Sequence, residues 1–310
     1  MTRVAAVDCG TNSIRLLIAD VDHEQLTLTD VVRVMETVRL GEGVDRTGEF
    51  SSAALQRTFG ACERYAKQLH MHGVDEVRFV ATSASRDVSN RAQFVDGVRQ
   101  RLGVTPEVIS GEEEAELSFS GAISSLAASI GSDSALVVDI GGGSTEFVRG
   151  TTQEGVAAAH SVDIGCVRMT ERHLRADPPT QQQLASAIRD IDAAIDQAAS
   201  AVDLGRTRTL VGLAGSVTTV AALALDLPEY DAVAINGSRV SAVDVERVTK
   251  RLLAMTRAQR ALLPVMHPGR VDVIGGGALI LHRIVVRGAF DEVLVSEHDI
   301  LDGIAWALAG

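Results

Sequence analysis

Residues 135–149 read A-L-V-V-D-I-G-G-G-S-T-E-F-V-R. An apolar run ends at Asp139, a glycine turn follows, and a second apolar run begins at Phe147. Two apolar runs on either side of a glycine turn predict a β-hairpin. The alternative interpretation is a plain tight hairpin with a chance acid.

The turn has the chemistry of a phosphate-binding loop. The glycines at 141–143 carry no Cβ, so their N–H groups can converge on an anion, and the hydroxyls of Ser144 and Thr145 add donors. A phosphate would repel Asp139 unless a cation lay between them, which implies a divalent metal such as Mg²⁺. Glu146 then remains as an acid beside the phosphate.

The pattern occurs a second time near the N-terminus. Residues 4–21 read V-A-A-V-D-C-G-T-N-S-I-R-L-L-I-A-D-V, and Asp8, Gly10 and Ser13 repeat the D-x-G-x-x-S spacing of the first hairpin. The repeat predicts two similar half-domains whose hairpins face one cleft, as in the actin, Hsp70 and sugar-kinase superfamily. A Rossmann dinucleotide site fits less well, because neither turn reads G-x-G-x-x-G at the start of a helix.

Composition limits the function further. With 310 residues and 46% hydrophobic content the chain can form two domains. No apolar run is long enough for a membrane helix and no signal-type segment opens the chain, so we expect a cytoplasmic protein that does not bind membranes. Its three cysteines contain no C-x-x-C pair, which predicts free thiols. The net charge of −12 argues against nucleic-acid binding, so a phosphorylated substrate requires a local arginine lining.

Two more candidates lie in the first half. Arg86 follows the predicted strand at 77–81, where α/β sheets place ligand groups, although an ordinary exposed arginine is the alternative. The run E-E-E-A-E at 112–116 reads as a solvated first helical turn. Glu114 differs because its neighbours at helical spacing are small or apolar, so it can point inward with a raised pKa suited to accepting a proton.

The second half offers a further anion site. A predicted strand at 209–213 runs into a helix that begins with Gly215 and Ser216, and the N-terminus of that helix can receive a phosphate. The alternative is that both residues only allow close packing. The glycines at 275–277 interrupt a helix-like apolar pattern and require another helix or a ligand to approach their backbone. We place the boundary between the halves within residues 124–131, and we expect Ser51 or Ser52, Asn90 and Ser241 to cap helices.

Over nearly its whole length the chain resembles the exopolyphosphatase and guanosine pentaphosphate phosphatase family, Ppx/GppA. The matching motifs, in the family's order, are D-C-G-T-N-S-I-R-L, A-T-S-A-S-R-D-V-S-N, I-S-G-E-E-E-A, V-V-D-I-G-G-G-S-T-E, D-I-G-C-V-R, A-G-S-V-T-T-V-A-A and R-V-D-V-I-G-G-G-A-L-I-L. The resemblance implies an α/β fold of two actin-like, ribonuclease H-like domains with an interdomain cleft. It also implies hydrolysis of a terminal phosphoanhydride with Mg²⁺, or with Mn²⁺ as the alternative ion.

The resemblance assigns roles residue by residue. It makes Glu114 the general base, Glu146 its acidic partner, and Asp8 and Asp139 ligands of the metal or of its waters. The candidate phosphate-binding residues, from the loops and the resemblance together, are Gly10, Thr11, Asn12, Ser13, Arg15, Arg86, Gly141, Gly142, Gly143, Ser144, Thr145, Gly215 and Ser216.

The expected domains are residues 1–124, with a terminal helix at 298–310 packing back on them, and residues 125–297. The chain departs from the family by Asn236 in place of a histidine before Gly237, and by ending without the C-terminal helical domain of longer members. We therefore expect short chains of inorganic polyphosphate as substrate, and a homodimer. The alternatives are guanosine pentaphosphate as substrate, a kinase of the same superfamily, or a weakly catalytic sensor that binds polyphosphate or guanosine tetra- or pentaphosphate.

Overall fold

The chain divides into two compact units. The computed structural model describes residues 2–22, 24–25, 27–74, 76–86, 88–131, 133–207 and 209–309, without the side chain of Arg206. The first unit comprises Met1–Gly121 and Ile300–Gly310, and the second comprises Ala122–Asp299. These bounds differ from the predicted ones by three residues at one junction and by two at the other.

The first unit is built on a five-stranded sheet with the strand order β3-β2-β1-β4-β5. β1 pairs antiparallel with β2 and parallel with β4. The strands of this sheet are β1 (Thr2–Cys9), β2 (Ser13–Asp22), β3 (Thr27–Thr37), β4 (Glu76–Ala81) and β5 (Glu107–Val108). Its helices are α1 (Val44–Thr47), α2 (Ser52–His72), α3 (Ser83–Arg86), α4 (Arg91–Leu102), the start of α5 (Gly111–Ile130), and α13 (Ile300–Ala309).

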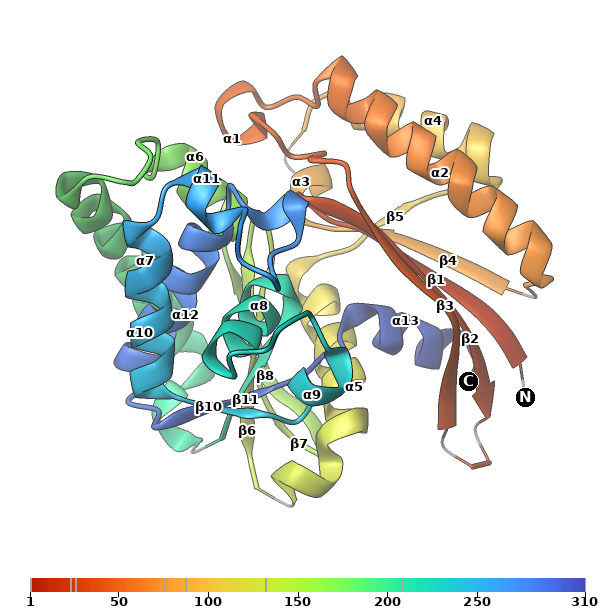
Figure 1. Ribbon diagram of the computed structural model, residues 1–310. Coiled ribbons are helices and arrows are strands. Elements are labelled where there is room, and N and C mark those ends of the chain that lie inside the picture. The colour runs from red at the N-terminus through yellow and green to blue at the C-terminus, as the bar shows by residue number, and fades with distance from the viewer. Residues whose placement is uncertain are drawn as a thin grey trace. The chain divides into compact units, whose positions relative to one another are not determined.

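Alternating residues of β1 pack into two different cores. Ala5 and Val7 face a cluster that includes residues of α2 and α4, whereas Val4 and Ala6 face a cluster that includes residues of α13. Successive strand residues point to opposite faces of a sheet, so these helices cover opposite faces (Figure 1). The continuous apolar composition of β1 follows from its burial on both sides.

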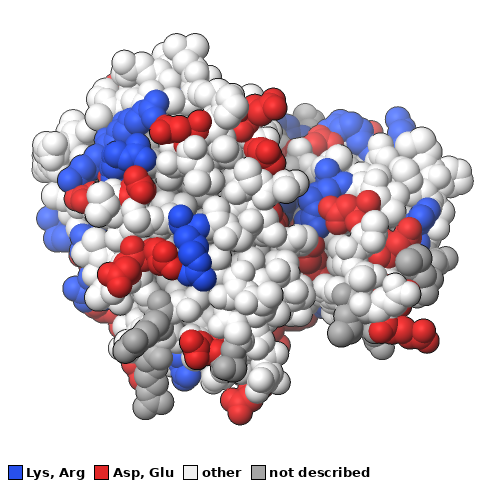
Figure 2. Space-filling model, turned by 60° about the horizontal axis from the view of Figure 1, so that its bottom comes forward, with Lys and Arg blue, Asp and Glu red and all other residues white. Residues whose placement is uncertain are grey.

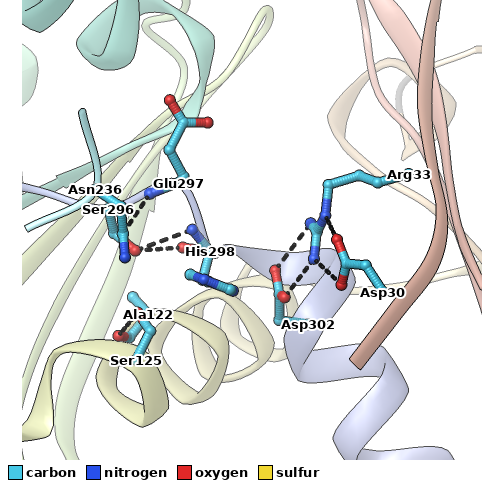
Figure 3. Close-up of polar contacts among 9 residues, drawn as sticks. All are labelled: Asp30, Arg33, Ala122, Ser125, Asn236, Ser296, Glu297, His298 and Asp302. Atoms are coloured by element: carbon cyan, nitrogen blue, oxygen red, sulfur yellow. Dashed lines mark hydrogen bonds and ion pairs between the residues drawn. The ribbon is translucent and has the colours of Figure 1, made fainter. Parts of the chain in front are cut away.

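An ion-pair cluster fixes α13 to the edge of this sheet. Arg33 of β3 donates from Nη2 to Asp302 Oδ1 of α13 at 2.6 Å, and from Nε to Asp30 Oδ2 at 2.6 Å (Figure 3). Asp302 is only 1% exposed, so its carboxylate depends on this guanidinium for charge compensation. Gly303 also packs closely, since a Cβ there would lie 2.0 Å from the Leu117 carbonyl oxygen.

The second unit repeats this sheet. Its strand order is β10-β11-β9-β6-β7-β8, in which β8-β7-β6-β9-β11 matches β3-β2-β1-β4-β5 of the first unit, with the same parallel and antiparallel pairings. The strands are β6 (Ala135–Ile140), β7 (Thr145–Thr151), β8 (Gly155–Val162), β9 (Thr209–Leu213), β10 (Arg239–Ser241) and β11 (Glu292–Val295). The predicted α/β class with two similar domains is confirmed.

The core of the second unit lies between this sheet and its helices. These are α6 (Cys166–Arg172), α7 (Gln181–Val202), α8 (Ala214–Ala224), α9 (Ala232–Ile235), α10 (Ala242–Ala254), α11 (Arg257–Arg260) and α12 (Ile274–Arg287), with 3₁₀ turns at Leu204–Arg206 and Pro268–Arg270. In α12 a Cβ at Gly276 would lie 2.8 Å from the Cys166 carbonyl oxygen, and one at Gly277 would lie 2.1 Å from Ser216 Oγ. The predicted close approach at these glycines is therefore made by α6 and α8.

Residues 124–131 do not form a linker. They continue α5 without a break to Ile130, because Leu126 and Ile130 are buried at helical spacing among alanines, which favour helix. The junction between the two units therefore lies inside a helix. In the part of the chain that the structure describes, no helix is long and apolar enough to cross a membrane.

Asn236 holds the backbone that follows the last strand of the second unit. Its Oδ1 accepts the Glu297 N–H at 3.1 Å, and Ser296 Oγ donates to the His298 carbonyl at 2.8 Å (Figure 3). Gly237 adopts φ +75°, which accounts for a glycine after Asn236. Asn236, which stands where the family has a histidine, therefore accepts a hydrogen bond from this segment.

Opposite charges are mixed on the surface. On the face that Figure 2 shows, Lys and Arg side chains lie next to Asp and Glu side chains. Many described arginines take part in ion pairs, such as Arg247 with Asp244 at 2.9 Å. Pairs of this exposed kind contribute little to stability.

Candidate active site

The glycine turn of the second unit connects β6 to β7 as predicted. Asp139 pairs with Glu146 across the hairpin, and Ile140 pairs with Thr145. The Gly141 N–H donates to the Ser144 carbonyl at 3.1 Å and closes the turn.

The carbonyl groups of this turn are held by the start of α6. Those of residues 141–143 accept hydrogen bonds from the N–H groups of Cys166 and Val167, each at 2.9 Å, and from Arg168 Nε at 2.7 Å. The peptide bonds of the turn are trans, so each carbonyl points opposite to the N–H that follows it. The N–H groups of residues 142–144 therefore point away from α6, as three neighbouring donors of the kind that binds an anion.

Gly165 allows α6 to approach the turn this closely. A Cβ at Gly165 would lie 2.4 Å from both the carbonyl carbon and the carbonyl oxygen of Gly142. No side chain fits in that space, so the residue before α6 must be glycine for the loop to keep its shape.

Acidic and hydroxyl side chains form a row across the three strands behind the turn. Glu146 is opposite Asp139 on one side and opposite Ser161 on the other. Directly opposed residues share one face of a sheet, with Cβ atoms about 5 Å apart. Asp139 is 7% exposed and Glu146 is 1% exposed, and Ser161 Oγ donates to Glu146 Oε1 at 2.8 Å. Two carboxylates are thus buried side by side, an arrangement that a cation would stabilise.

Thr145 does not fit its predicted role. Its hydroxyl is fully buried and donates to the Ile164 carbonyl at 2.5 Å. A threonine hydroxyl has one hydrogen to donate, so this hydroxyl holds the loop in place instead of binding a phosphate. Sequence spacing could not show this, because the acceptor lies nineteen residues away.

The first unit contains a second loop of the same design. The Gly10 N–H donates to the Ser13 carbonyl at 2.9 Å, as in the other turn. The carbonyls of Thr11 and Asn12 accept N–H groups from residues 38–41 at 2.8 to 3.1 Å. The N–H groups of Asn12 and Ser13 therefore point away from that segment, and both predicted loops present backbone donors.

The two loops differ in the partner of their aspartate. Asp8 Oδ2 accepts Arg15 Nη2 at 2.7 Å and Nε at 3.0 Å, and Asp8 is opposite Arg15 in the sheet. The corresponding position in the second unit is Glu146, since Arg15 and Glu146 follow Asp8 and Asp139 by the same seven residues. The second unit therefore has a carboxylate at the position where the first unit has a guanidinium.

Arg86 and Glu114 meet in the first unit. Arg86 Nη1 donates to Glu114 Oε2 at 2.7 Å and to the Ile109 carbonyl at 3.3 Å. Glu114 is 8% exposed, whereas Glu112 and Glu116 of the same helix are exposed, so the predicted inward orientation of Glu114 is confirmed. This guanidinium compensates the charge of the buried carboxylate.

Gly215 and Ser216 begin α8 beside a cation that the sequence analysis missed. A Cβ at Gly215 would lie 2.2 Å from the guanidinium carbon of Arg270, and Arg270 Nη1 donates to Thr219 Oγ1 at 3.1 Å. Ser216 is buried against Gly277. Gly215 therefore makes room for an arginine at the start of α8. The sequence signal for Arg270 is its place at the start of the motif R-V-D-V-I-G-G-G-A-L-I-L, just before the glycines of α12.

The thiols are not nucleophiles. Cys9, Cys62 and Cys166 are free and buried, as predicted. Burial raises the pKa of Cys9 well above its usual value and raises the pKa of Cys62 to about 12. A thiol that stays protonated at neutral pH cannot attack a phosphorus atom.

The donor set of the second loop fits Mg²⁺ or Mn²⁺. Among the described residues, no group of three or more His, Cys, Asp or Glu side chains forms a metal cage. Mg²⁺ seldom needs one, since it is usually bound by one or two carboxylates together with waters and the phosphates of a substrate. Asp139 and Glu146 provide such carboxylates, and Asp8, whose Oδ2 binds Arg15, stays a predicted ligand through Oδ1.

Comparison with known proteins assigns the chain to a family. A model of the Ppx/GppA phosphatase family matches residues 17–304. The chain belongs to the Ppx/GppA phosphatase family. Exopolyphosphatase 2 of Mycobacterium tuberculosis is 51% identical over 323 aligned residues, which cover 100% of this chain and 99% of the relative.

The chain is also similar to a guanosine phosphate pyrophosphatase and to a solved structure. The guanosine-5'-triphosphate,3'-diphosphate pyrophosphatase of Aeromonas salmonicida is 28% identical over 99% of this chain, which corresponds to 59% of that protein. Among solved structures, an exopolyphosphatase-like protein superposes with a TM-score of 0.95 at 46% identity and covers 99% of this chain and 97% of its own.

Proposed function

We propose that this protein is an exopolyphosphatase that hydrolyses the terminal phosphoanhydride of inorganic polyphosphate and releases orthophosphate. Membership of the Ppx/GppA family and the likeness to a mycobacterial exopolyphosphatase support this proposal. The observation that carries it is the loop at 141–144, whose carbonyls are held by α6 so that three N–H groups are left for an anion.

Each unit, taken by itself, carries groups of the kind that phosphoryl transfer needs. In the first unit, Glu114 can orient a water molecule and accept its proton, while Arg86 balances the charge of Glu114. In the second unit, the loop donors bind phosphate oxygens, and Asp139 and Glu146 hold the metal. When bound, Mg²⁺ would add positive charge at the phosphate oxygens. Phosphoryl transfer has a loose transition state, so positioning and electrostatics of this kind provide most of the rate.

A second candidate substrate is guanosine pentaphosphate, which also ends in a phosphoanhydride. The observation in its favour is the likeness to the Aeromonas pyrophosphatase, at lower identity than that to the exopolyphosphatase. The same loop and glutamates would serve either substrate, so the two proposals differ in what binds beyond the terminal phosphates.

The proposed location and assembly are the cytoplasm and a homodimer. Three free, buried thiols support a reducing compartment. Large apolar side chains on the surface of the second unit, among them Val233, Val243 and Leu262, support self-association. Sedimentation of the purified protein tests the assembly, and a monomer at micromolar concentration would contradict it.

The deciding experiment measures orthophosphate release with Mg²⁺ from tripolyphosphate, long-chain polyphosphate and guanosine pentaphosphate. We expect Glu114→Gln to lower turnover by about 10²- to 10⁴-fold with little change in KM, because it removes the proton acceptor and keeps the shape. The matched control is Glu112→Gln, which changes an exposed glutamate of the same helix turn and should leave the rate unchanged.

The outcomes separate the candidates. Release from polyphosphate that depends on Glu114 and stops with a chelator supports the proposal. Release only from guanosine pentaphosphate transfers the function to the second candidate. Binding of all three substrates without release identifies a sensor, and a Glu114→Gln variant with normal turnover removes Glu114 from the mechanism.

A further inference from the structure

A serine of β8 contacts one of the two carboxylates beside the glycine loop of the second unit. Ser161 Oγ donates to Glu146 Oε1 at 2.8 Å, and the two residues are directly opposite each other in the sheet. Glu146 is buried, whereas Ser161 is half-buried. The sequence analysis gave Ser161 no role, because it lies fifteen residues from Glu146 and outside the motifs that match the family.

The first unit provides an internal comparison, because its sheet has the same pairings. Three residues are opposite one another across neighbouring strands in each unit, namely Asp8, Arg15 and Met35 in the first and Asp139, Glu146 and Ser161 in the second. Where the middle residue is an arginine, it bonds the aspartate, and the third residue is a methionine, whose thioether has no hydrogen to donate. Where the middle residue is a glutamate, the third residue is a hydroxyl donor that bonds it. The hydroxyl therefore accompanies the second carboxylate, since the sheet topology is shared by both units.

Ser161 begins a short segment, residues 161–168, that holds the glycine loop. The Ile164 carbonyl accepts the Thr145 hydroxyl at 2.5 Å, and N–H groups at the start of α6 bond the loop carbonyls at 2.9 Å. Ser161 adds a contact of another kind, to the carboxylate that follows the loop. The segment thus fixes both the turn and the acid beside it.

The hydrogen bond from Ser161 offsets two effects that would displace the Glu146 carboxylate. A glutamate side chain has several rotatable bonds, and it loses this freedom when it is held in one orientation. In the absence of a cation, an ionised Asp139 next to it also repels it and favours orientations that turn away. A hydrogen bond to an ionised carboxylate is stronger than one between neutral groups. The Ser161 hydroxyl can therefore hold Glu146 against both effects.

We propose that Ser161 is a positioning residue, which holds the Glu146 carboxylate in place beside Asp139 for the metal ion. The inference rests on the proposed function, in which these two carboxylates bind Mg²⁺, and extends it to a residue that touches neither the metal nor the substrate. Groups that orient a metal ligand typically account for roughly 10- to 100-fold in metal affinity or activity. Ser161 acts on metal binding and on the reaction through Glu146.

Two serine variants test this role. Ser161→Ala removes the donor, and the matched control Ser200→Ala removes a hydroxyl from an exposed position of α7, where it bonds the backbone of its own helix. Titration with Mn²⁺ alone, followed by the electron paramagnetic resonance of the free ion, gives a dissociation constant for each protein. We expect Ser161→Ala to raise this constant roughly tenfold or more and to lower kcat/KM with tripolyphosphate by a similar factor at a fixed Mg²⁺ concentration. Ser161→Thr keeps the hydroxyl and should recover most of both losses, and the control should stay within about twofold of the wild type.

A thermal cycle shows whether Ser161 acts through Glu146. Ser161→Ala should lower the melting temperature by roughly 3 °C or more, because it removes the donor of a buried carboxylate. In a Glu146→Ala background the same change should lower it by less than about 1 °C, because the acceptor is gone. Equal shifts in the two backgrounds would give Ser161 a structural role only and would overturn the proposal.

The remaining outcomes separate this inference from the proposed function. Unchanged Mn²⁺ binding in Ser161→Ala, or an equal loss in Ser200→Ala, contradicts the positioning role. A wild type that binds Mn²⁺ but releases no orthophosphate ends the proposed function, and the titration and the thermal cycle still judge Ser161. A wild type that binds no Mn²⁺ overturns the positioning role, because there is then no metal ion for which Glu146 is held.

Discussion

At the scale of single residues, both arginines that were predicted to bind phosphate are already paired with buried carboxylates. Arg15 binds Asp8, and Arg86 binds Glu114. An arriving phosphate must therefore share a guanidinium that compensates an acid of the protein. At Glu114 this sharing would weaken the hold of Arg86 on the carboxylate when substrate binds.

The Arg86–Glu114 pair can be tested by a stability cycle. Arg86→Ala should lower the free energy of unfolding by about 2 kcal/mol, because it leaves a buried carboxylate without its guanidinium. Adding Glu114→Gln should recover most of this loss, since the uncompensated charge is then gone. Denaturant unfolding of the two single variants and the double variant measures both effects, and additive losses would show that the pair is not coupled.

Single residues also show where sequence reasoning succeeded. The inward orientation of Glu114 was predictable, because its small and apolar neighbours lie within one helical turn. Its pairing with Arg86 was not, because 28 residues separate them and only the fold brings them together. Separation along the sequence also explains why two other contacts were not predicted, that of Thr145 with the Ile164 carbonyl and that of Arg270 with Gly215.

At the scale of elements, α6 gives the glycine loop its shape by binding its carbonyls. Gly165→Ala should lower kcat/KM by at least roughly tenfold, because a Cβ 2.4 Å from Gly142 must displace the loop and misplace its donors. The matched control is Gly60→Ala within α2, where the nearest atom is 3.5 Å away and helix propensity favours alanine by about 1 kcal/mol. Phosphate-release kinetics check both, and full activity in Gly165→Ala would contradict the role given to α6.

The 3₁₀ turn at Pro268–Arg270 is expected to make the stability of the fold depend on pH through His267. His267 Nδ1 accepts the Gly269 N–H at 3.1 Å at the start of a 3₁₀ turn, and burial, then the charge of Arg270, lowers the pKa of His267 below 6.5. The unfolded chain therefore takes up a proton first as the pH falls below about 6.5, and stability declines from there down to the folded pKa. His267→Asn keeps an acceptor without titrating.

Thermal unfolding at several pH values between about 7 and 5 compares the two proteins. The variant should lose less stability than the wild type over this range. Parallel curves would show that His267 does not contribute to the acid sensitivity.

Helix caps show why some elements were predictable and others not. Ser51 and Ser241 accept N–H groups three residues ahead, as local spacing predicts. Asn90 occupies the expected position before α4, but its amide bonds the N–H and the carbonyl of Phe50, both at 2.9 Å. Asn90 thus bonds a residue 40 positions earlier in the sequence and does not cap the N-terminus of α4 with its side chain. The boundary placed within residues 124–131 was also wrong, because α5 runs through this stretch to Ile130.

At the scale of the whole molecule, the repeat explains most of the fold. One D-x-G-x-x-S pattern in each half predicted two similar sheets, and the structure has the same strand order and the same turn-closing bond in both units. The copies diverge where Arg15 corresponds to Glu146. The sequence predicted the shared sheet topology, but it did not predict that Asp8 pairs with an arginine while Asp139 lies beside a glutamate. A repeated spacing shows that two segments are similar, and it does not show which charges lie next to each other.

Glu146→Arg tests this divergence. The new arginine should pair with Asp139 as Arg15 pairs with Asp8, so the variant should fold with a melting temperature close to that of the wild type. Its release of orthophosphate with Mg²⁺ should fall by at least roughly 10²-fold, because a fixed guanidinium replaces a carboxylate that we propose binds the metal. Glu146→Gln is the control for loss of charge alone, and an active Glu146→Arg variant would show that this carboxylate is dispensable.

The helix α13 has a consequence for synthesis. Val4, Ala6, Leu17 and Ala19 are made early, yet Ile300, Leu301, Ile304 and Ala305 are part of the core that buries them. On the ribosome, that face of the first sheet lacks these partners until residues 300–305 have emerged. The second unit is one continuous segment and can complete its core first. The first unit, although its strands are made before those of the second, is therefore the unit that finishes folding last.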